Sequence, residues 1–91
     1  MNNWDERRRQ FAALHDRGTF VMPNAHDQGA CRLLSSLGFL ALASTSAGMA
    51  NSLGRLDMTT ARHDLIENVR LLAACTELPV NVDAEQCFPE E

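Results

Sequence analysis

The chain has 91 residues, of which 45% are apolar and 22% are charged. A chain of this length has room for one small domain, and its composition is that of a folded protein rather than a disordered one. Its apolar runs are far shorter than the roughly 20 residues that cross a bilayer. Its first residues lack the apolar stretch of a secretory signal, so neither a membrane protein nor a secreted one is expected.

The charged side chains comprise eight arginines and twelve acids, which gives a net charge of −4. Binding to nucleic acid or to an anionic membrane requires a cationic surface, so we expect neither partner. The basic run Arg7–Arg9 is preceded by Asp5 and Glu6, and we interpret it as the solvated face of a helix. Three cysteines without a C-x-x-C pair favour neither a disulfide framework nor a zinc site, and they predict a cytoplasmic protein.

Hydrophobic periodicity and stop residues predict the order helix, strand, helix, strand, helix, strand. Helices are expected over 3–17, over 26–37, and from Thr59 or Thr60 to 76; strands are expected over 19–24, 39–44 and 78–83. The segment 45–58, rich in small and polar residues, is predicted to be a loop.

The expected helices carry apolar residues at helical spacing. The first has a capping box at Asn3 and Glu6, and its basic residue Arg7 is predicted to face outward with Arg8 and Gln10. The stripes expected to face the core are Trp4, Phe11, Ala12 and Leu14, then Ala30, Leu33, Leu34 and Leu37, then Leu65, Ile66, Val69, Leu72 and Ala73.

Strands joined by helix-length connections form parallel sheets, so the predicted fold class is α/β. A flavodoxin-like or Rossmann sheet normally has five or six strands. A (β/α)8 barrel takes about 250 residues, of which residues 1–91 would supply about three of eight units. We therefore expect a single incomplete segment of a larger α/β domain, with a helix over 3–17 and three strands with two intervening helices over 19–91.

Two acids follow the third expected strand, at the end where parallel α/β folds bind ligands. Asp83 and Glu85 are two residues apart, so on a continuing strand they point the same way. Mg²⁺ is bound in proteins through one or two carboxylates together with water and substrate oxygens, which makes this pair a candidate metal site. The alternative is that both are solvated loop acids.

Small residues follow the second expected strand. The backbone N–H groups of Ser46, Ala47 and Gly48 are suited to holding an anion or a developing oxyanion, although an ordinary turn has the same composition. Asp57 precedes the third expected helix, where it is either a first-turn acid or an outer ligand of the metal site.

Three segments, in this order and spacing, are similar to the isocitrate lyase/phosphoenolpyruvate mutase family. Residues 20–30 (FVMPNAHDQGA) resemble the family's first strand and turn, residues 42–55 (LASTSAGMANSLGR) its second strand and loop, and residues 78–85 (LPVNVDAE) its third strand with an acidic ending. The resemblance extends from about residue 11 to residue 88 and covers the N-terminal portion of the family's fold.

The resemblance implies the N-terminal part of a (β/α)8 barrel, in a parent enzyme that often forms homo-oligomers. It implies a Mg²⁺-dependent lyase or mutase that makes or breaks a C–C or P–C bond in a small 2-oxo or 2-hydroxy carboxylate, through an enolpyruvate-like oxyanion. Methylisocitrate lyase and phosphoenolpyruvate mutase are members of this family.

Residue by residue, the resemblance implies that Asp83 and Glu85 hold Mg²⁺, mostly through water. It places Asp57 on the substrate or metal side of the site. It further implies that the loop of Ser46, Ala47 and Gly48 grips the carboxylate and the oxyanion of the substrate.

The sequence departs from the family directly after the acidic pair. Family members usually have Asn-Gly or Thr-Gly and an aromatic residue there, whereas this chain has Gln86, Cys87 and Phe88. A left-handed backbone at the glycine position would suit Cys87 poorly. Because five strands of the barrel are not in the chain, we expect these residues alone to be inactive. The alternative is a non-catalytic remnant or interaction module that pairs its open strand edges.

Overall fold

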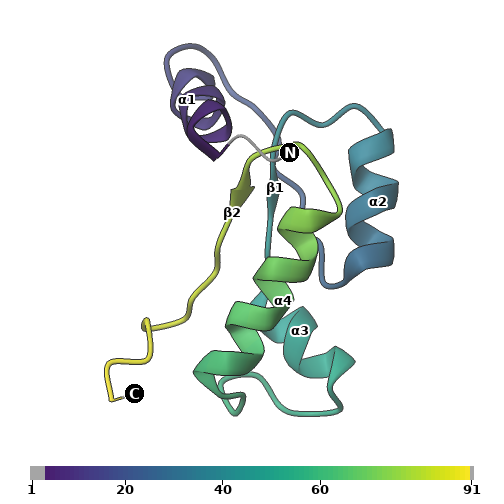
Figure 1. Ribbon diagram of the computed structural model, residues 1–91, viewed down its shortest axis with the longest axis vertical. Coiled ribbons are helices and arrows are strands. Elements are labelled where there is room, and N and C mark those ends of the chain that lie inside the picture. Colours follow the sequence, from purple (N-terminus) through teal and green to yellow (C-terminus); the bar gives the residue numbers. More distant parts are fainter. Residues whose placement is uncertain (1–3, 91) are drawn as a thin grey trace.

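The computed structural model describes residues 4–90, in which parallel strand segments lie beside four helices (Figure 1). The helices are α1 (Trp4–Leu14), α2 (Gln28–Ser36), α3 (Ser46–Ser52) and α4 (Arg62–Ala74), and the strands are β1 (Leu42–Ala43) and β2 (Val80–Asn81). Leu42 pairs with Val80 and Ala43 with Asn81 in parallel register, while Asn24 forms a single parallel bridge to Ala43. The three expected strand segments are therefore parallel neighbours with β1 in the middle, and the α/β class is confirmed.

The strands are shorter than the sequence predicts. Only two residues of 39–44 and two of 78–83 form strands, and segment 19–24 contributes the bridge at Asn24 alone. Each outer segment contains a proline, which has no N–H to donate to a ladder. Both prolines instead accept through their carbonyl groups, Pro79 from the Leu42 N–H at 2.9 Å and Pro23 from the Ala43 N–H at 2.9 Å.

The segment predicted as a loop over 45–58 contains helix α3, so that prediction was wrong for residues 46–52. Thr45 caps the helix, because its side-chain oxygen accepts the Gly48 N–H at 3.2 Å. Met49 and Ala50 are buried against the rest of the chain. Tertiary packing therefore stabilises a helix that is too short and too rich in polar residues for local propensity to reveal it.

Helices α2 and α4 begin later than predicted. Asp27 caps α2 by accepting the Ala30 N–H at 2.8 Å. Helix α4 begins at Arg62, so the predicted capping by Thr59 or Thr60 is wrong. Its first turn is held instead by Asp64, whose carboxylate accepts the Ala61 N–H at 2.9 Å.

The core lies between α2, α4 and the strands, and Figure 1 shows these two helices side by side on one side of β1 and β2. Cys31, Leu42 and Leu72 are its largest buried side chains. The predicted stripes are buried in part only: Leu33, Leu37 and Ile66 are 61%, 63% and 50% exposed. Each helix packs on the strands along a narrower face than its sequence pattern indicates.

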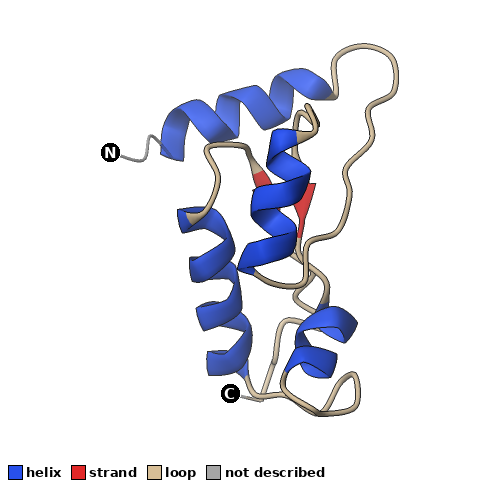
Figure 2. Cartoon of the chain, turned by 90° about the vertical axis from the view of Figure 1, so that its right-hand side faces the viewer, coloured by secondary structure: helices blue, strands red, loops and turns tan. Residues whose placement is uncertain are grey.

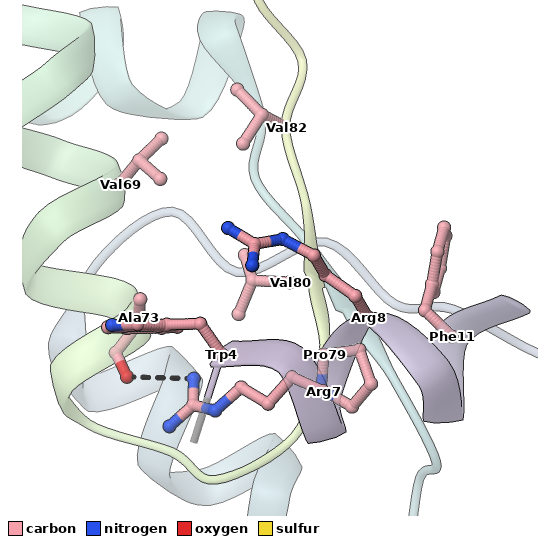
Figure 3. Close-up of a pocket in the computed structure, with 9 residues that line it drawn as sticks. All are labelled: Trp4, Arg7, Arg8, Phe11, Val69, Ala73, Pro79, Val80 and Val82. Carbon is pink, nitrogen blue, oxygen red and sulfur yellow. Dashed lines mark hydrogen bonds between the residues drawn. The ribbon is translucent and has the colours of Figure 1, made fainter. Parts of the chain in front are cut away.

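Helix α1 crosses the end of the strands opposite to α3 (Figure 2). The prediction that Arg7 faces outward was wrong, since this residue is only 7% exposed. Its guanidinium donates to the carbonyl oxygen of Ala73 at 3.1 Å (Figure 3). It also donates to the carbonyl oxygens of Leu78, at 3.3 Å, and of Thr76. The last carbonyls of a helix have no intrahelical partner, so a cation placed there satisfies them and complements the helix dipole.

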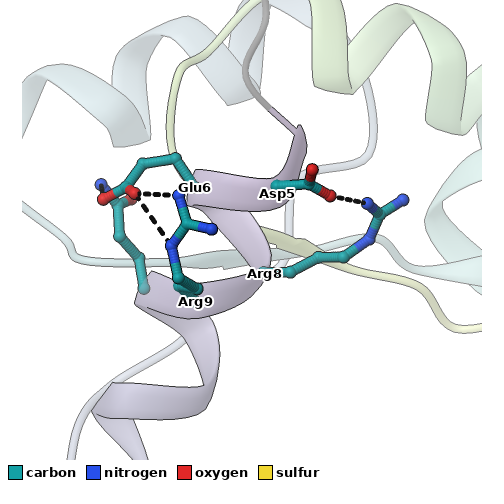
Figure 4. A network of polar contacts seen from close by, with 5 residues as sticks. Asp5, Glu6, Arg8 and Arg9 are labelled. Atoms are coloured by element: carbon teal, nitrogen blue, oxygen red, sulfur yellow. Dashed lines mark hydrogen bonds and ion pairs between the residues drawn. The ribbon is translucent and has the colours of Figure 1, made fainter.

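The two other arginines of the basic run are solvated, as predicted. Arg8 pairs with Asp5 at 2.9 Å and Arg9 with Glu6 at 2.8 Å, one turn apart along α1 (Figure 4). The predicted cap Asn3 lies outside the described residues. Among the helices of residues 4–90, none combines the length and the apolar character needed to cross a bilayer.

Candidate active site

The residues that follow β1 and β2 meet at one end of the molecule, where Asp83 contacts the start of α3. Its Oδ2 accepts the backbone N–H of Ser46 at 3.2 Å and the hydroxyl of the same residue at 3.2 Å. The backbone N–H of Asp83 in turn donates to Ser44 Oγ at 2.8 Å. Three hydrogen bonds thus fix the segment after β2 to the segment after β1, as expected for the carboxyl ends of adjacent parallel strands.

A second carboxylate reaches the same hydroxyl, because Ser46 Oγ lies 3.2 Å from Asp57 Oδ1. A serine hydroxyl has one hydrogen and can donate to only one acceptor at a time. Asp57 and Asp83 therefore compete for this one hydrogen bond from a buried hydroxyl. Both aspartates are exposed, so solvent can donate to the carboxylate that the hydroxyl does not reach.

Hydrogen bonding keeps Asp83 ionised. The backbone N–H of Ser46 has the largest effect in lowering the pKa of this carboxyl, and the N–H of Glu85 adds to it. Donors directed at a carboxylate stabilise its charged form. Asp83 is accordingly a fixed anion at neutral pH, oriented by the end of β1.

The surroundings of Glu85 shift the pKa of its carboxyl in the opposite direction to that of Asp83. Burial raises the pKa of its carboxyl, and the charges of Asp57 and Asp83 raise it further. Its Oε2 is buried and has no hydrogen-bond partner among the described residues. An unpaired buried carboxylate oxygen is unfavourable unless a donor or a cation meets it.

This donor set fits Mg²⁺. Mg²⁺ prefers oxygen ligands and commonly uses only one or two carboxylates, with water and substrate oxygens completing its octahedron. Asp83 and Glu85 offer two carboxylates, one of them with a buried oxygen that has no partner. Within residues 4–90, no three His, Cys, Asp or Glu side chains are gathered into a complete metal cage. A metal here would therefore depend on water and substrate for most of its ligands.

The start of α3 has fewer backbone N–H groups available to an anion than the sequence suggests. The N–H groups of Ser46 and Gly48 donate to Asp83 Oδ2 and to Thr45 Oγ1, so two of the three predicted anion donors are used within the chain. Ala47 is exposed at the same turn. What this turn offers a ligand is the Ser46 hydroxyl and a surface of small side chains.

One role in the site was not assigned from the sequence. Ser44 is 4% exposed and accepts the Asp83 N–H, a role for which its place at the end of an apolar run was the available signal. Cys87 has φ +67°, the left-handed conformation that the sequence comparison raised as a poor fit for cysteine at the family's glycine position.

Replacing Ser44 with alanine is expected to lower the free energy of unfolding by about 1–2 kcal/mol, because the Asp83 N–H loses its acceptor in a partly buried position. The control is Ser36→Ala, which removes an exposed hydroxyl bonded to the Leu33 carbonyl of its own helix and should cost less than about 0.5 kcal/mol. Urea unfolding measures both. Equal losses of unfolding free energy for the two variants would show that the hydrogen bond from the Asp83 N–H to Ser44 does not stabilise the contact between the strand ends.

Comparison with known proteins places this geometry in context. Residues 11–91 match the model of a family described as phosphoenolpyruvate phosphomutase. A provisionally assigned lyase/mutase from Burkholderia cenocepacia J2315 is 41% identical, with a TM-score of 0.90 over 94% of this chain and 31% of that protein. The 2,3-dimethylmalate lyase of the PEP mutase/isocitrate lyase superfamily is 29% identical, with a TM-score of 0.72 over 85% of this chain and 29% of that lyase.

The chain thus spans about a third of the length of either solved structure. No functionally curated protein sequence matches it significantly.

Proposed function

Because the chain belongs to the phosphoenolpyruvate phosphomutase family, we propose that it forms the first part of the active site of a Mg²⁺-dependent lyase or mutase. The proposed substrate is a small 2-oxo or 2-hydroxy carboxylate. The observation that carries the proposal is the convergence of Asp57 and Asp83 on the hydroxyl of Ser46. Glu85 is near enough to both that their charges raise the pKa of its carboxyl. In a full-length barrel the remaining site residues would come from later strands, so we expect residues 1–91 alone to be inactive.

In this proposal Asp83 and Glu85 hold the metal. When bound, Mg²⁺ stabilises negative charge on an enolate-type oxygen as a Lewis acid. Asp83 is held in place for this role by the N–H of Ser46 and the hydroxyl of Ser44. Preorganised groups of this kind lower a reaction barrier because they need not reorient as charge develops.

Ser46 is the proposed donor to the substrate. Its buried hydroxyl lies between two carboxylates and can turn from Asp57 or Asp83 toward an oxyanion once a cation offsets their charge. The small side chains of Ala47 and Gly48 would let the substrate carboxylate approach the turn closely. Asp57 would accept a hydrogen bond from the substrate or from a metal-bound water.

Calorimetry with Mg²⁺ and oxalate tests the proposal, because oxalate is planar and has the charge distribution of an enolpyruvate oxyanion. We expect oxalate to bind only when Mg²⁺ is present. The double variant Asp83→Ala, Glu85→Gln should lower the affinity at least tenfold, since even indirect partners of a metal contribute roughly tenfold to hundredfold.

The matched control is Glu67→Gln, which removes a carboxylate that pairs with Arg70 on the surface of α4. This variant should bind like the original chain. Undiminished binding to the double variant would contradict the metal assignment.

A further inference from the structure

A hollow of about 540 Å³ lies beside the carboxylate site, between the segment before α4 and the C-terminal segment. Met58 and Thr60 line it from the first segment, and the residues of 85–90 other than Cys87 line it from the second. Glu85 therefore belongs both to the candidate metal site and to the wall of this hollow. The family resemblance assigned no role to Met58 or Thr60.

Two oxygen atoms in this wall lack partners. Thr60 Oγ1 and Glu85 Oε2 are the buried side-chain N or O atoms without a hydrogen bond within residues 4–90, and both residues line the hollow. Thr60 is only 7% exposed, so its hydroxyl is largely screened from bulk water. Buried polar groups in folded proteins are nearly always satisfied, so two exceptions in one wall point to a missing partner.

The backbone of the wall is strained at the same place. Met58, Glu85 and Phe88 have φ values of 70°, 55° and 49°, and Cys87 beside them has 67°. Within residues 4–90 these four are the non-glycine residues with positive φ. Left-handed backbone at such residues is unfavourable and tends to cluster at ligand sites.

The lining restricts the chemistry of an occupant. It holds the carboxylates of Glu85 and Glu90, the amide of Gln86 and the hydroxyl of Thr60, and it contains no arginine, lysine or histidine. An anionic group would meet two like charges and no positively charged side chain, so without a bound cation the lining itself favours a neutral occupant over a carboxylate or phosphate. Phe88 and Pro89 add an apolar surface suited to a carbon chain.

From this we propose that the hollow is a subsite for an uncharged, hydroxyl-bearing group. A ligand hydroxyl would donate to Glu85 Oε2 and accept from the Thr60 hydroxyl, so both unpaired oxygens gain a partner. An ionised carboxylate has lone pairs enough to accept this bond and to face a cation as well. As the neighbour of the metal site, the subsite rests on the proposed function: it would receive the neutral end of a hydroxylated substrate whose carboxylate lies near Ser46.

Glycerol is the probe, because it is neutral and tests the subsite without Mg²⁺. In ¹H–¹⁵N spectra we expect saturable shifts of the amides of 58–60 and 85–90 as glycerol is added. Thr60→Val keeps the shape of the side chain and removes its hydroxyl, and it should weaken glycerol binding about tenfold. Thr60→Ser should retain binding. Acetate, which is anionic, should leave these amides unshifted.

The melting temperature separates this role from a structural one. If the Thr60 hydroxyl is unpaired in the free protein, Thr60→Val should melt a few degrees higher while it binds glycerol more weakly. A lower melting temperature for Thr60→Val would mean that the hydroxyl has a partner within the fold, and would overturn the proposal. Shifts that do not saturate, or that are equal in Thr60→Val and the original chain, would also overturn it.

Separate measurements test the proposed metal site and the proposed subsite, so either proposal can be refuted without the other. Asp83→Asn alters the metal site but does not line the hollow, so glycerol binding should survive this change. In Asp83→Asn the Mg²⁺-dependent oxalate binding should be lost. In the original chain, absence of Mg²⁺-dependent oxalate binding while glycerol still binds would refute the proposed function and leave only the subsite. The reverse result would refute the subsite alone.

Discussion

Replacing Arg7 with alanine is expected to lower the free energy of unfolding by about 2–4 kcal/mol, the largest loss we predict for a single side chain. The guanidinium is buried and donates to three carbonyl groups, those of Ala73, Thr76 and Leu78. Alanine would leave these acceptors under α1 without their donor and would remove the contact that docks α1 on the end of α4. Urea unfolding followed by circular dichroism measures the loss.

The neighbouring arginine is the control. Arg8→Ala removes an exposed guanidinium that pairs with Asp5 on the same helix, so it should cost less than about 0.5 kcal/mol. Arg7→Lys should fall between the two variants, because an ammonium group keeps the charge but lacks the planar fork that reaches several acceptors. Equal stabilities for Arg7→Ala and Arg8→Ala would show that the buried bonds contribute nothing.

Replacing Gly48 with alanine is expected to lower the free energy of unfolding by about 1–3 kcal/mol through overpacking. A Cβ atom at this position would lie 2.6 Å from Thr45 Cγ2 and 2.7 Å from His26 Cβ. Thr45 cannot turn away without giving up the bond that caps α3, and the Cβ of His26 moves only with its backbone. Because the shift would displace the turn that holds Asp83, the variant should also bind Mg²⁺ with oxalate more weakly.

Gly29→Ala is the matched control for this change. Gly29 lies inside α2, and an added Cβ would meet only Asp27 Oδ1 at an ordinary 3.6 Å. Alanine has the higher helix propensity, so this variant should be as stable as the original chain or up to about 1 kcal/mol more stable. A melting temperature that falls for Gly48→Ala and stays level or rises for Gly29→Ala would support the close packing at Gly48. A Gly48→Ala variant that melts at the temperature of the original chain would contradict it.

The sequence was sufficient to predict the family and the meeting of the strand ends. The meeting of the strand ends follows from a local pattern, because an apolar run such as 39–43 followed by small polar residues marks a buried parallel strand and its ligand-binding end. The family was predicted from the resemblance of residues 20–30, 42–55 and 78–85, in that order and spacing, to the isocitrate lyase/phosphoenolpyruvate mutase family, and the family match confirms it. The roles assigned to Asp83 and Glu85 remain predictions.

Contacts between distant residues could not be predicted from the sequence. Arg7 lies within a charged run typical of a solvated helix, and its three acceptors are 66 to 71 residues away along the chain. The cap of α4 was misplaced because Thr59 and Thr60 have the usual capping side chains, whereas the carboxylate of Asp64 performs that role from inside the helix. The unpaired hydroxyl of Thr60 is apparent only once the hollow around it is known.

The central claim is that Asp83, Glu85 and the start of α3 form a divalent cation site, and paramagnetic broadening by Mn²⁺ tests it most directly. Mn²⁺ replaces Mg²⁺ at oxygen sites and broadens the amide signals nearest to it. At low Mn²⁺ we predict that the amides of Ser46 and of 83–86 broaden first, and that Asp83→Asn with Glu85→Gln abolishes this. Broadening that begins at the surface acids Asp5 and Glu67, with the amides of 83–86 unaffected, would contradict the account.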